Sequence, residues 1–229
     1  MLLSGGLDSA VLLAEEAAQS HDVQPIYVRV GLAWESAERE AIDSLLALWP
    51  LGPRVRALTT LAVDMSDVYP PEHWAMVGRP PGYHTPDEAV YLPGRNIILL
   101  GKAAVFCARA GVDRLVMGTL GHNPFPDATP GFRSAMAAAL SLGLDHRLHI
   151  DAPYADLNKA EVIRRGAVLD LRLELTLSCM SPVGPKVEGS APVPLHCGTC
   201  SKCRERHDAF VEAGIADPTA YADYSFVDD

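Results

Sequence analysis

The sequence predicts an α/β fold, a parallel twisted sheet with helices on both faces, followed by a small zinc-binding C-terminal region. Strand-like and helix-like segments alternate along most of the chain, which is typical of parallel strands joined by covering helices. A glycine-rich turn precedes the first helix, and cysteines gather after Thr176. We therefore expect one domain over residues 1–176, and a four-cysteine zinc region with a C-terminal helix over 177–229.

The individual elements follow from periodicity and from turn residues. Helices are expected where apolar residues recur every three or four positions, and strands where short apolar runs are bounded by turn residues. Because Pro25 cannot donate a ladder hydrogen bond, the start of its strand should be loop or edge. Asn158 is the expected N-cap of the last helix before the cysteine region. The expected helices cover 9–21, 35–49, 94–111, 131–143 and 158–170, and the expected strands 23–30, 54–64, 114–118 and 148–154.

The length, composition and net charge of the chain limit the classes of protein to which it can belong. The 229 residues are 48% hydrophobic and 21% charged, with a net charge of −10. An acidic surface disfavours stable nucleic-acid binding, which needs clustered Lys and Arg, so a small-molecule substrate is expected. No apolar run approaches the roughly 20 residues that span a bilayer, and no signal segment is evident. We expect a cytoplasmic protein with no membrane partner.

The segment "SGGLDS", residues 4–9, has the composition of a phosphate-binding turn. Glycines allow close backbone approach, and the N-terminus of the following helix offers N–H groups to an anion. The segment lacks the Gly-Lys-Ser/Thr of a Walker A loop and the Gly-x-Gly-x-x-Gly of a Rossmann turn. An ordinary strand-to-helix turn is the alternative. The strand before it is only Leu2-Leu3, unless the chain starts upstream.

The cysteines after residue 176 have the spacing of a metal site. Cys197, Cys200 and Cys203 form two overlapping C-x-x-C steps, which can wrap one tetrahedral zinc ion, and Cys179 is the expected fourth ligand. His196 is a rival fourth ligand, an Fe–S cluster is a rival occupant, and metal-free thiols or disulfides are a further alternative. Four cysteine ligands leave no open position, so this zinc should be structural.

The stretch 69–89 is rich in Pro and Gly. It is too long for a tight connection between a strand and a helix, and its length predicts a functional or mobile loop.

Several motifs carry a resemblance to known enzymes. "SGGLDS" resembles the SGGxDS loop of the PP-loop ATP pyrophosphatases (adenine nucleotide α-hydrolase-like proteins), which grips the β,γ-pyrophosphate of ATP while a substrate attacks the α-phosphate. Other stretches resemble, in the right order, motifs of the 7-cyano-7-deazaguanine synthase family, and the resemblance runs from about residue 2 to 210. These stretches are "LPGRN" (92–96), "FPDATPGFR" (125–133), "LNKAEVI" (157–163) and "LTLSC" to "CGTCSKCRER" (175–206).

The resemblance implies a reaction and its cofactors. Members of that family use ATP, Mg²⁺ and ammonia to convert 7-carboxy-7-deazaguanine to the nitrile, a step in queuosine precursor biosynthesis. The carboxylate is adenylated, ammonia gives the amide, and a second ATP activates the amide for dehydration. The implied cofactors are ATP, Mg²⁺ and a structural Zn²⁺, and a homodimer is one expectation.

The resemblance also implies roles for individual residues. Asp8 would help hold Mg²⁺, Lys159 would contact phosphate oxygens, and both, with Arg95, are the implied catalytic residues. Arg95 and Asn96 would contact nucleotide or substrate, and Asp127 would accept hydrogen bonds from a guanine-like base. Taken alone, Lys159 could be a solvated helix residue, Arg95 a structural ion pair and Asp127 a turn former. The implied pyrophosphate-binding residues are Ser4, Gly5, Gly6, Leu7, Asp8 and Ser9.

Three departures from the family pattern leave alternatives open. The segment 27–38, "YVRVGLAWESAE", lacks a Gln-Arg-His run, Ala128 stands where the family has Cys, and 182–194 is an insertion. These differences leave open a divergent homologue that forms an amide or conjugates the deazaguanine to another amine.

Two further function classes compete with an amide- or nitrile-forming enzyme. One is a PP-loop tRNA-modifying enzyme, such as one that thiolates tRNA. Sulfur carriers need an accessible reactive thiol, whereas the four-cysteine site is closed and Cys107 lies in an apolar helix and is expected to be a core residue. The other is a binding protein with a decayed ATP site, against which the intact "SGGLDS" and Lys159 argue.

Overall fold

The computed structural model describes residues 1–19, 21–49, 51–121, 123–184 and 193–227. Part of the insertion noted above, residues 185–192, lies outside the described residues. The helices are α1 (Leu7–Ala18), α2 (Glu35–Leu48), α3 (Trp74–Val77), α4 (Arg95–Ala110), α5 (Pro130–Leu144), α6 (Lys159–Val168) and α7 (Ser201–Ala213), and the strands are β1 (Ile26–Arg29), β2 (Thr59–Ala62), β3 (Arg114–Val116) and β4 (His149–Asp151).

The strands form two parallel pairs that the first residues of the chain connect. β1 pairs with β2, and β3 pairs with β4. The Leu3 N–H donates to the Ile26 carbonyl at 2.9 Å, and the Leu2 N–H donates to the Val116 carbonyl at 2.9 Å. Residues 1–3 therefore lie between β1 and β3, and the glycine turn that follows them leaves from the middle of the strand layer.

Pro25 shortens the first two strands from their expected lengths. Val23 and Val55 form an isolated parallel bridge, but the regular ladder starts only at Ile26 and Thr59. Pro25 has no N–H to give to a neighbouring strand, and the Gln24 side-chain amide instead donates to the Ala57 carbonyl at 2.7 Å. The expected strands 23–30 and 54–64 are therefore reduced to β1 and β2.

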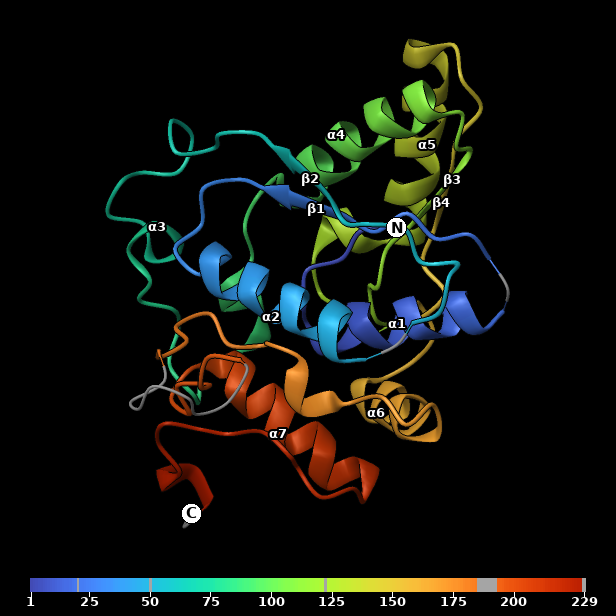
Figure 1. Ribbon diagram of the computed structural model, residues 1–229. Coiled ribbons are helices and arrows are strands. Elements are labelled where there is room, and N and C mark those ends of the chain that lie inside the picture. Colours follow the sequence, from blue (N-terminus) through green and yellow to red (C-terminus); the bar gives the residue numbers. More distant parts are fainter. Residues whose placement is uncertain (20, 50, 122, 185–192, 228–229) are drawn as a thin grey trace.

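Helices cover both faces of the strands, as the sequence predicts. Figure 1 shows α4 and α5 on one side and α1 and α2 on the other. Successive strand residues point to opposite faces: Ile26 and Val28 pack into the apolar cluster that holds Leu100 of α4, whereas Tyr27 packs into the cluster that holds Leu12 of α1. The predicted parallel α/β fold is thereby confirmed.

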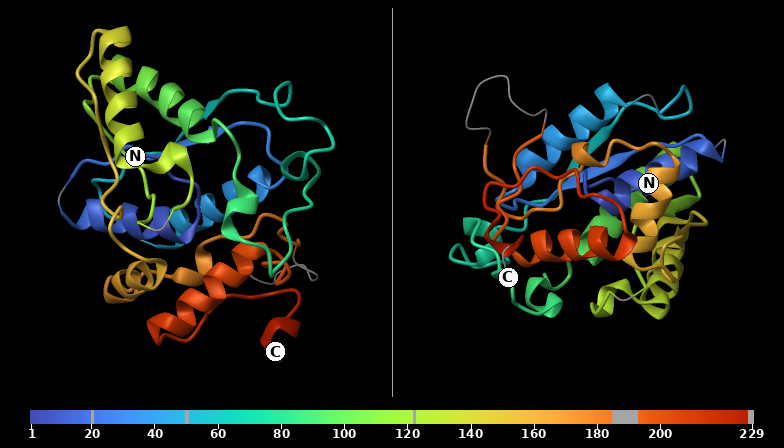
Figure 2. Two further views of the ribbon diagram at one scale, coloured as in Figure 1. Left: turned by 180° about the vertical axis from the view of Figure 1, so that it is seen from behind. Right: turned by 90° about the horizontal axis from the view of Figure 1, so that it is seen from below.

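The C-terminal region packs against the same core as α1. Figures 1 and 2 show α6 and α7 side by side, on the far side of α1 and α2 from α4. The fully buried Arg206 of α7 donates to the side chains of Thr176 and Thr219 and to the Leu173 carbonyl, so it ties α7 to the segment before the first zinc-region cysteine. Across the described ranges, no helix has the length and apolarity to cross a membrane.

The long loop 69–89 is attached to α7. It contains α3, and the Ser201 N–H donates to the Pro81 carbonyl at 3.1 Å. The Arg204 guanidinium donates to the Tyr83 and Thr85 carbonyls and to Asp87. These contacts hold Asp87 at the edge of the cavity described next.

Candidate active site

The segment "SGGLDS" forms a tight turn that opens onto the first turn of α1. Gly5 has a φ of 75°, and a Cβ there would lie 3.0 Å from the Glu38 carbonyl oxygen and from Ile42 Cγ1, so only glycine fits. The first α1 hydrogen bond runs from the Ala10 N–H to the Gly6 carbonyl. The amides of residues 7–9 precede that bond and are available to an anion.

The two serines of the segment hold its shape. The Ser9 hydroxyl donates to the Gly6 carbonyl at 3.0 Å and accepts from the Ser4 N–H at 3.3 Å. The Gly6 N–H donates to the Ser4 hydroxyl at 3.3 Å. This network closes the turn on itself, which is the preorganisation that a phosphate cradle needs.

The turn lies at the wall of two adjoining cavities. The larger has a volume of about 400 Å³, within the range of small-molecule sites, and the smaller about 230 Å³. Both are lined by Ser4, Gly6, Asp8, Glu38, Arg95, Gly118 and Thr119. The larger also takes in Trp34, Asp87, Phe125, Lys159, Lys202 and Glu205. The predicted residues Asp8, Arg95 and Lys159 therefore meet in one place.

A chain of alternating charges crosses the larger cavity. Lys159 Nζ lies 3.4 Å from Asp8 Oδ2 and also pairs with Glu205, which in turn pairs with Lys202. Lys159 begins α6, and its side chain is only 12% exposed. It is therefore a buried cation between two carboxylates, not a solvated helix residue.

Burial and ion pairing shift the pKa values of Lys159, Glu205 and Asp8 in opposite directions. Burial alone lowers the pKa of Lys159, but Asp8 and Glu205 outweigh it, so the net pKa is raised and the side chain stays an ammonium. Burial alone raises the pKa of Glu205, but Lys159 and Lys202 lower it to about 2. For Asp8 burial prevails over Lys159, and its pKa is raised. Asp8 is thus the carboxylate that lacks enough positive charge nearby.

Three buried polar atoms at the cavities lack a partner within the described part of the chain. They are Asp8 Oδ1, Arg95 Nε and Thr119 Oγ1. Buried polar atoms are normally hydrogen-bonded, so these point to a ligand with both acceptors and a cation. Phosphate oxygens suit the Arg95 and Thr119 donors, and Mg²⁺ prefers carboxylate oxygen such as that of Asp8. The residues present therefore fit a magnesium-bound polyphosphate.

Asn96 and Asp127 contact each other at the start of α4. The Asp127 carboxylate accepts from the Asn96 N–H at 3.1 Å and from the Asn96 side-chain amide at 3.3 Å. Asp127 is 5% exposed. Asn96 lines the smaller cavity, whereas Asp127 is not among the described lining residues of either. In this arrangement Asp127 caps α4, and its predicted contact with a base stays a prediction.

Sequence reasoning missed Glu38 and Glu205. The buried Glu38 accepts from the Tyr27 hydroxyl at 2.8 Å and from the Trp34 indole at 3.1 Å, and it lines both cavities. Burial raises its pKa, although Arg95 counteracts this. Glu205 stands three residues after Lys202, a spacing that usually indicates an exposed helix pair. Only the packing of α7 turns that pair inward.

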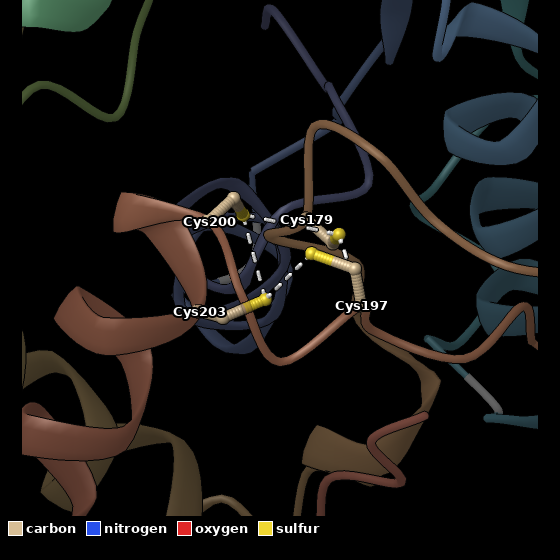
Figure 3. A group of neighbouring side chains, drawn as sticks. All are labelled: Cys179, Cys197, Cys200 and Cys203. Atoms are coloured by element: carbon tan, nitrogen blue, oxygen red, sulfur yellow. Dashed lines mark hydrogen bonds between the residues drawn. The ribbon is translucent and has the colours of Figure 1, made fainter. Parts of the chain in front are cut away.

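The four zinc-region cysteines converge as predicted (Figure 3). All four Sγ atoms lie within 4.8 Å of one another, with Cys197–Cys203 at 3.8 Å and Cys179–Cys200 at 4.0 Å. A tetrahedral zinc with Zn–S bonds of about 2.3 Å sets sulfurs about 3.8 Å apart, so the cluster fits zinc.

His196 is not part of this cluster. Its Nε2 accepts from the Ser178 N–H at 3.0 Å, and the group of converging ligand atoms among the described residues consists of the four cysteines. The buried ring instead anchors the segment before Cys179. Cys107, as expected, is a core residue with 2% exposure.

Comparison with known proteins identifies the family. The family model described as "Queuosine biosynthesis protein QueC" matches residues 1–214. The chain is 31% identical to a 7-cyano-7-deazaguanine synthase of Caldicellulosiruptor bescii, over 96% of each chain. It is 32% identical to a protein of the same name from Methanopyrus kandleri, over 96% of this chain and 97% of that one. For the synthase of Dechloromonas aromatica the identity is 32%, over 96% of each chain.

These matches extend over the glycine turn, the cavity residues and the four cysteines alike. The chain therefore belongs to the QueC family of queuosine biosynthesis proteins.

Proposed function

We propose that the protein is an ATP-dependent carbon–nitrogen bond-forming enzyme that converts 7-carboxy-7-deazaguanine and ammonia to 7-cyano-7-deazaguanine. The names of its relatives suggest the product. The observation that carries the proposal is the meeting of the glycine turn, the unpartnered Asp8 Oδ1 and the Lys159 ammonium in one cavity. These are the groups needed to bind ATP and to stabilise departing pyrophosphate.

The first step is an adenylation. A substrate carboxylate oxygen attacks the α-phosphorus of ATP, and the bond from that phosphorus to the β-phosphate oxygen breaks. The amides of residues 7–9 and Lys159 hold the leaving pyrophosphate. Asp8 would hold Mg²⁺, which supplies further charge neutralisation there. The products are an acyl adenylate and pyrophosphate.

The next steps form the carbon–nitrogen bonds. Ammonia attacks the acyl carbon, AMP leaves, and the nitrogen loses a proton to give the amide. The amide oxygen then attacks the α-phosphorus of a second ATP and expels another pyrophosphate. Loss of AMP together with the remaining N–H protons gives the nitrile. Each nitrile therefore corresponds to two AMP and two pyrophosphate.

The cavity walls suit a flat purine-like ring. Trp34 and Phe125 line the larger cavity, and aromatic side chains are good stacking surfaces for nucleobases. Trp34 is held in place by its bond to Glu38 and by a stacked contact with Trp74, with ring centroids 5.8 Å apart and planes 4° apart. Trp34, within the divergent segment 27–38, thus contributes an aromatic side chain to the cavity wall.

The test is a product assay with a matched pair of variants. Purified protein is incubated with ATP, Mg²⁺, ammonium and 7-carboxy-7-deazaguanine, and AMP, pyrophosphate and deazaguanine products are quantified by mass spectrometry. We expect nitrile and two AMP per nitrile. Lys159→Met should lower AMP formation by about 100-fold or more, the usual scale for losing one transition-state donor. Lys102→Met, on the exposed side of α4, should leave it unchanged.

Three results would contradict the proposal or favour the alternative function. If no AMP forms with the deazaguanine acid, the proposed activity is wrong. If the amide accumulates as the end product, or nitrogen is taken only from another amine, the divergent amide-forming or conjugating alternative is correct. If Lys159→Met retains full activity, the assignment of the phosphate site is wrong.

A further inference from the structure

Three helices that meet at the larger cavity begin with a cation. Arg95 is the first residue of α4, Lys159 the first of α6 and Lys202 the second of α7, and all three line the cavity. A cation in the first turn opposes the helix dipole and costs stability. Neither α4 nor α7 has an acidic residue of its own in its first turn, although the Asp127 carboxylate accepts from the Asn96 N–H at the start of α4. The three cations therefore line the cavity at positions that the helix dipoles disfavour.

Lys202 is held toward the cavity by a shared carboxylate. Glu205 binds Lys202 with one oxygen and Lys159 with the other. The Lys202 side chain is 25% exposed, and the Glu205 side chain 20%. Each ammonium has three donors, so one carboxylate oxygen leaves donors of both lysines free for an anion. Glu205 thus presents two neighbouring cations to whatever occupies the cavity.

The four-cysteine cluster fixes the position of Lys202 and Glu205. Cys200 is the N-cap of α7, and Cys203 lies between Lys202 and Glu205 on its first turn. Both cysteines are at least 98% buried and belong to the four-cysteine cluster. The buried sulfurs hold the first turn of α7 in place. The backbone of Lys202 and Glu205 therefore has a fixed position relative to the glycine turn before α1.

We propose that Lys202 is a second phosphate-binding cation of the active site, which contacts the leaving pyrophosphate together with Lys159, and that Glu205 positions both lysines. This inference rests on the proposed function, whose adenylation step releases pyrophosphate. With magnesium-bound ATP in the cavity, Asp8 would hold the metal, and the Lys159 donor that now contacts Asp8 would be available to a phosphate oxygen. The two lysines then face the phosphate oxygens, and Glu205 keeps them side by side.

The first test measures binding of magnesium pyrophosphate and magnesium ATP by calorimetry, with no deazaguanine present. We expect Lys202→Met to weaken both Kd values by about 10- to 100-fold, the range for one hydrogen bond to a charged group. Lys202→Arg should recover part of this loss, since it keeps the charge. Lys102→Met should bind like the wild type. Zinc content and the circular dichroism spectrum of every variant establish that it is folded.

The second test separates positioning from binding. Glu205→Gln removes a negative charge beside the phosphate site, so magnesium pyrophosphate should bind at least as tightly as to the wild type. Because the lysines are then no longer held, kcat for AMP formation should fall by about 10-fold or more. If Glu205 only stabilised α7, its replacement would lower the melting temperature and weaken binding and turnover together, rather than slow turnover with binding undiminished.

The outcomes are distinct from those of the product assay. A folded, zinc-loaded Lys202→Met variant with wild-type Kd values overturns the inference, whether or not the nitrile is formed. A wild-type protein that binds no magnesium pyrophosphate also overturns it. A wild-type protein that binds magnesium pyrophosphate in a Lys202-dependent way but does not convert the deazaguanine acid refutes only the proposed function.

Discussion

At the scale of single residues, Gly5 is restricted both by its backbone conformation and by its packing against α2. Its φ of 75° lies in the left-handed region, and a Cβ would approach the Glu38 carbonyl and the Ile42 side chain to 3.0 Å. Gly52 offers a natural comparison, with a φ of 78° and nothing within 4 Å of a Cβ. The two glycines share the backbone strain and differ only in packing.

Gly5→Ala should therefore destabilise the protein more than Gly52→Ala. Left-handed backbone with a side chain costs about 1–2 kcal/mol, and overpacking adds about 1–3 kcal/mol at Gly5 alone. Urea unfolding measures both free energies, and calorimetry with magnesium ATP should show weakened binding only for Gly5→Ala. Equal losses of stability in the two variants, with intact ATP binding, would show that the α2 contact does not restrict this turn.

The family resemblance, rather than residue identity alone, brought several residues into one expected site. The cavities are lined by Ser4, Gly6, Leu7, Asp8, Ser9, Arg95 and Lys159, and their roles in binding and catalysis stay predictions. Glu38, Thr119 and Glu205 were not predicted, because an isolated Glu or Thr in a helix or loop carries no signal of its own. Their role depends on whether the side of the helix or loop that carries them faces the cavity or the solvent. Only the tertiary packing determines this.

At the scale of elements, an ion triad around the buried Glu16 connects α1 to two strands. Arg114 of β3 donates two hydrogen bonds to Glu16 of α1, at 2.6 and 2.9 Å, and one to Asp151 of β4 at 2.6 Å. The Glu16 side chain is 6% exposed. Burial alone raises the pKa of Glu16, but hydrogen bonds from Arg114 and His21 outweigh it, and the net pKa is lowered.

Glu16→Gln should lower the free energy of unfolding by about 1–3 kcal/mol at neutral pH, because it weakens charge-assisted bonds in a buried position. A lowered carboxyl pKa stabilises the fold above its ordinary value of 4.5, and this contribution is lost as the pH falls below that value. The difference between wild type and variant should therefore shrink below pH 4.5 in urea titrations.

Asp43→Asn is the matched control for this triad. It breaks the exposed Arg39–Asp43 pair of α2, which should cost less than about 0.5 kcal/mol. A loss at Asp43 as large as that at Glu16, or a loss at Glu16 that does not change with pH, would contradict the account of the triad.

The helix bounds were largely predictable, and the strand bounds were not. The expected helices 94–111 and 131–143 are observed as α4 (Arg95–Ala110) and α5 (Pro130–Leu144), and Asn158 caps α6 in a reciprocal capping box with Glu161. These features depend on neighbours within a few residues. The expected strand 54–64 shrank to four residues because Pro25 lies on the partner strand, which no local pattern around residue 54 reveals.

At the scale of the whole molecule, the four-cysteine cluster joins the C-terminal region to the rest. Three of its members come from the start of α7 or just before it, whereas Cys179 follows the segment whose Leu177 N–H bonds to the Gly5 carbonyl at 2.8 Å. A zinc ion bound there would therefore secure α7, the α1 turn and the cavity floor together.

Cys200→Ser should lose the zinc and destabilise this whole region, because metal binding is part of its folding free energy. Metal content, thermal unfolding and magnesium ATP binding should all fall together. Cys107→Ala is the control: it removes a core thiol far from the cluster and should keep full zinc content. Unchanged zinc content and melting temperature in Cys200→Ser would refute the site.

The sequence by itself determined the α/β class, most helix positions, the glycine turn before α1 and the set of four cysteines, because local periodicity, turn residues and cysteine spacing are read directly from the chain. The tertiary structure decided that residues 1–3 lie between β1 and β3, and that the starts of α1, α4, α6 and α7 surround one cavity. Asp8, Lys159 and Glu205 lie far apart in sequence and meet only because packed helices bring their N-termini together. Local periodicity sets each element, whereas burial of shared apolar surface selects which elements meet.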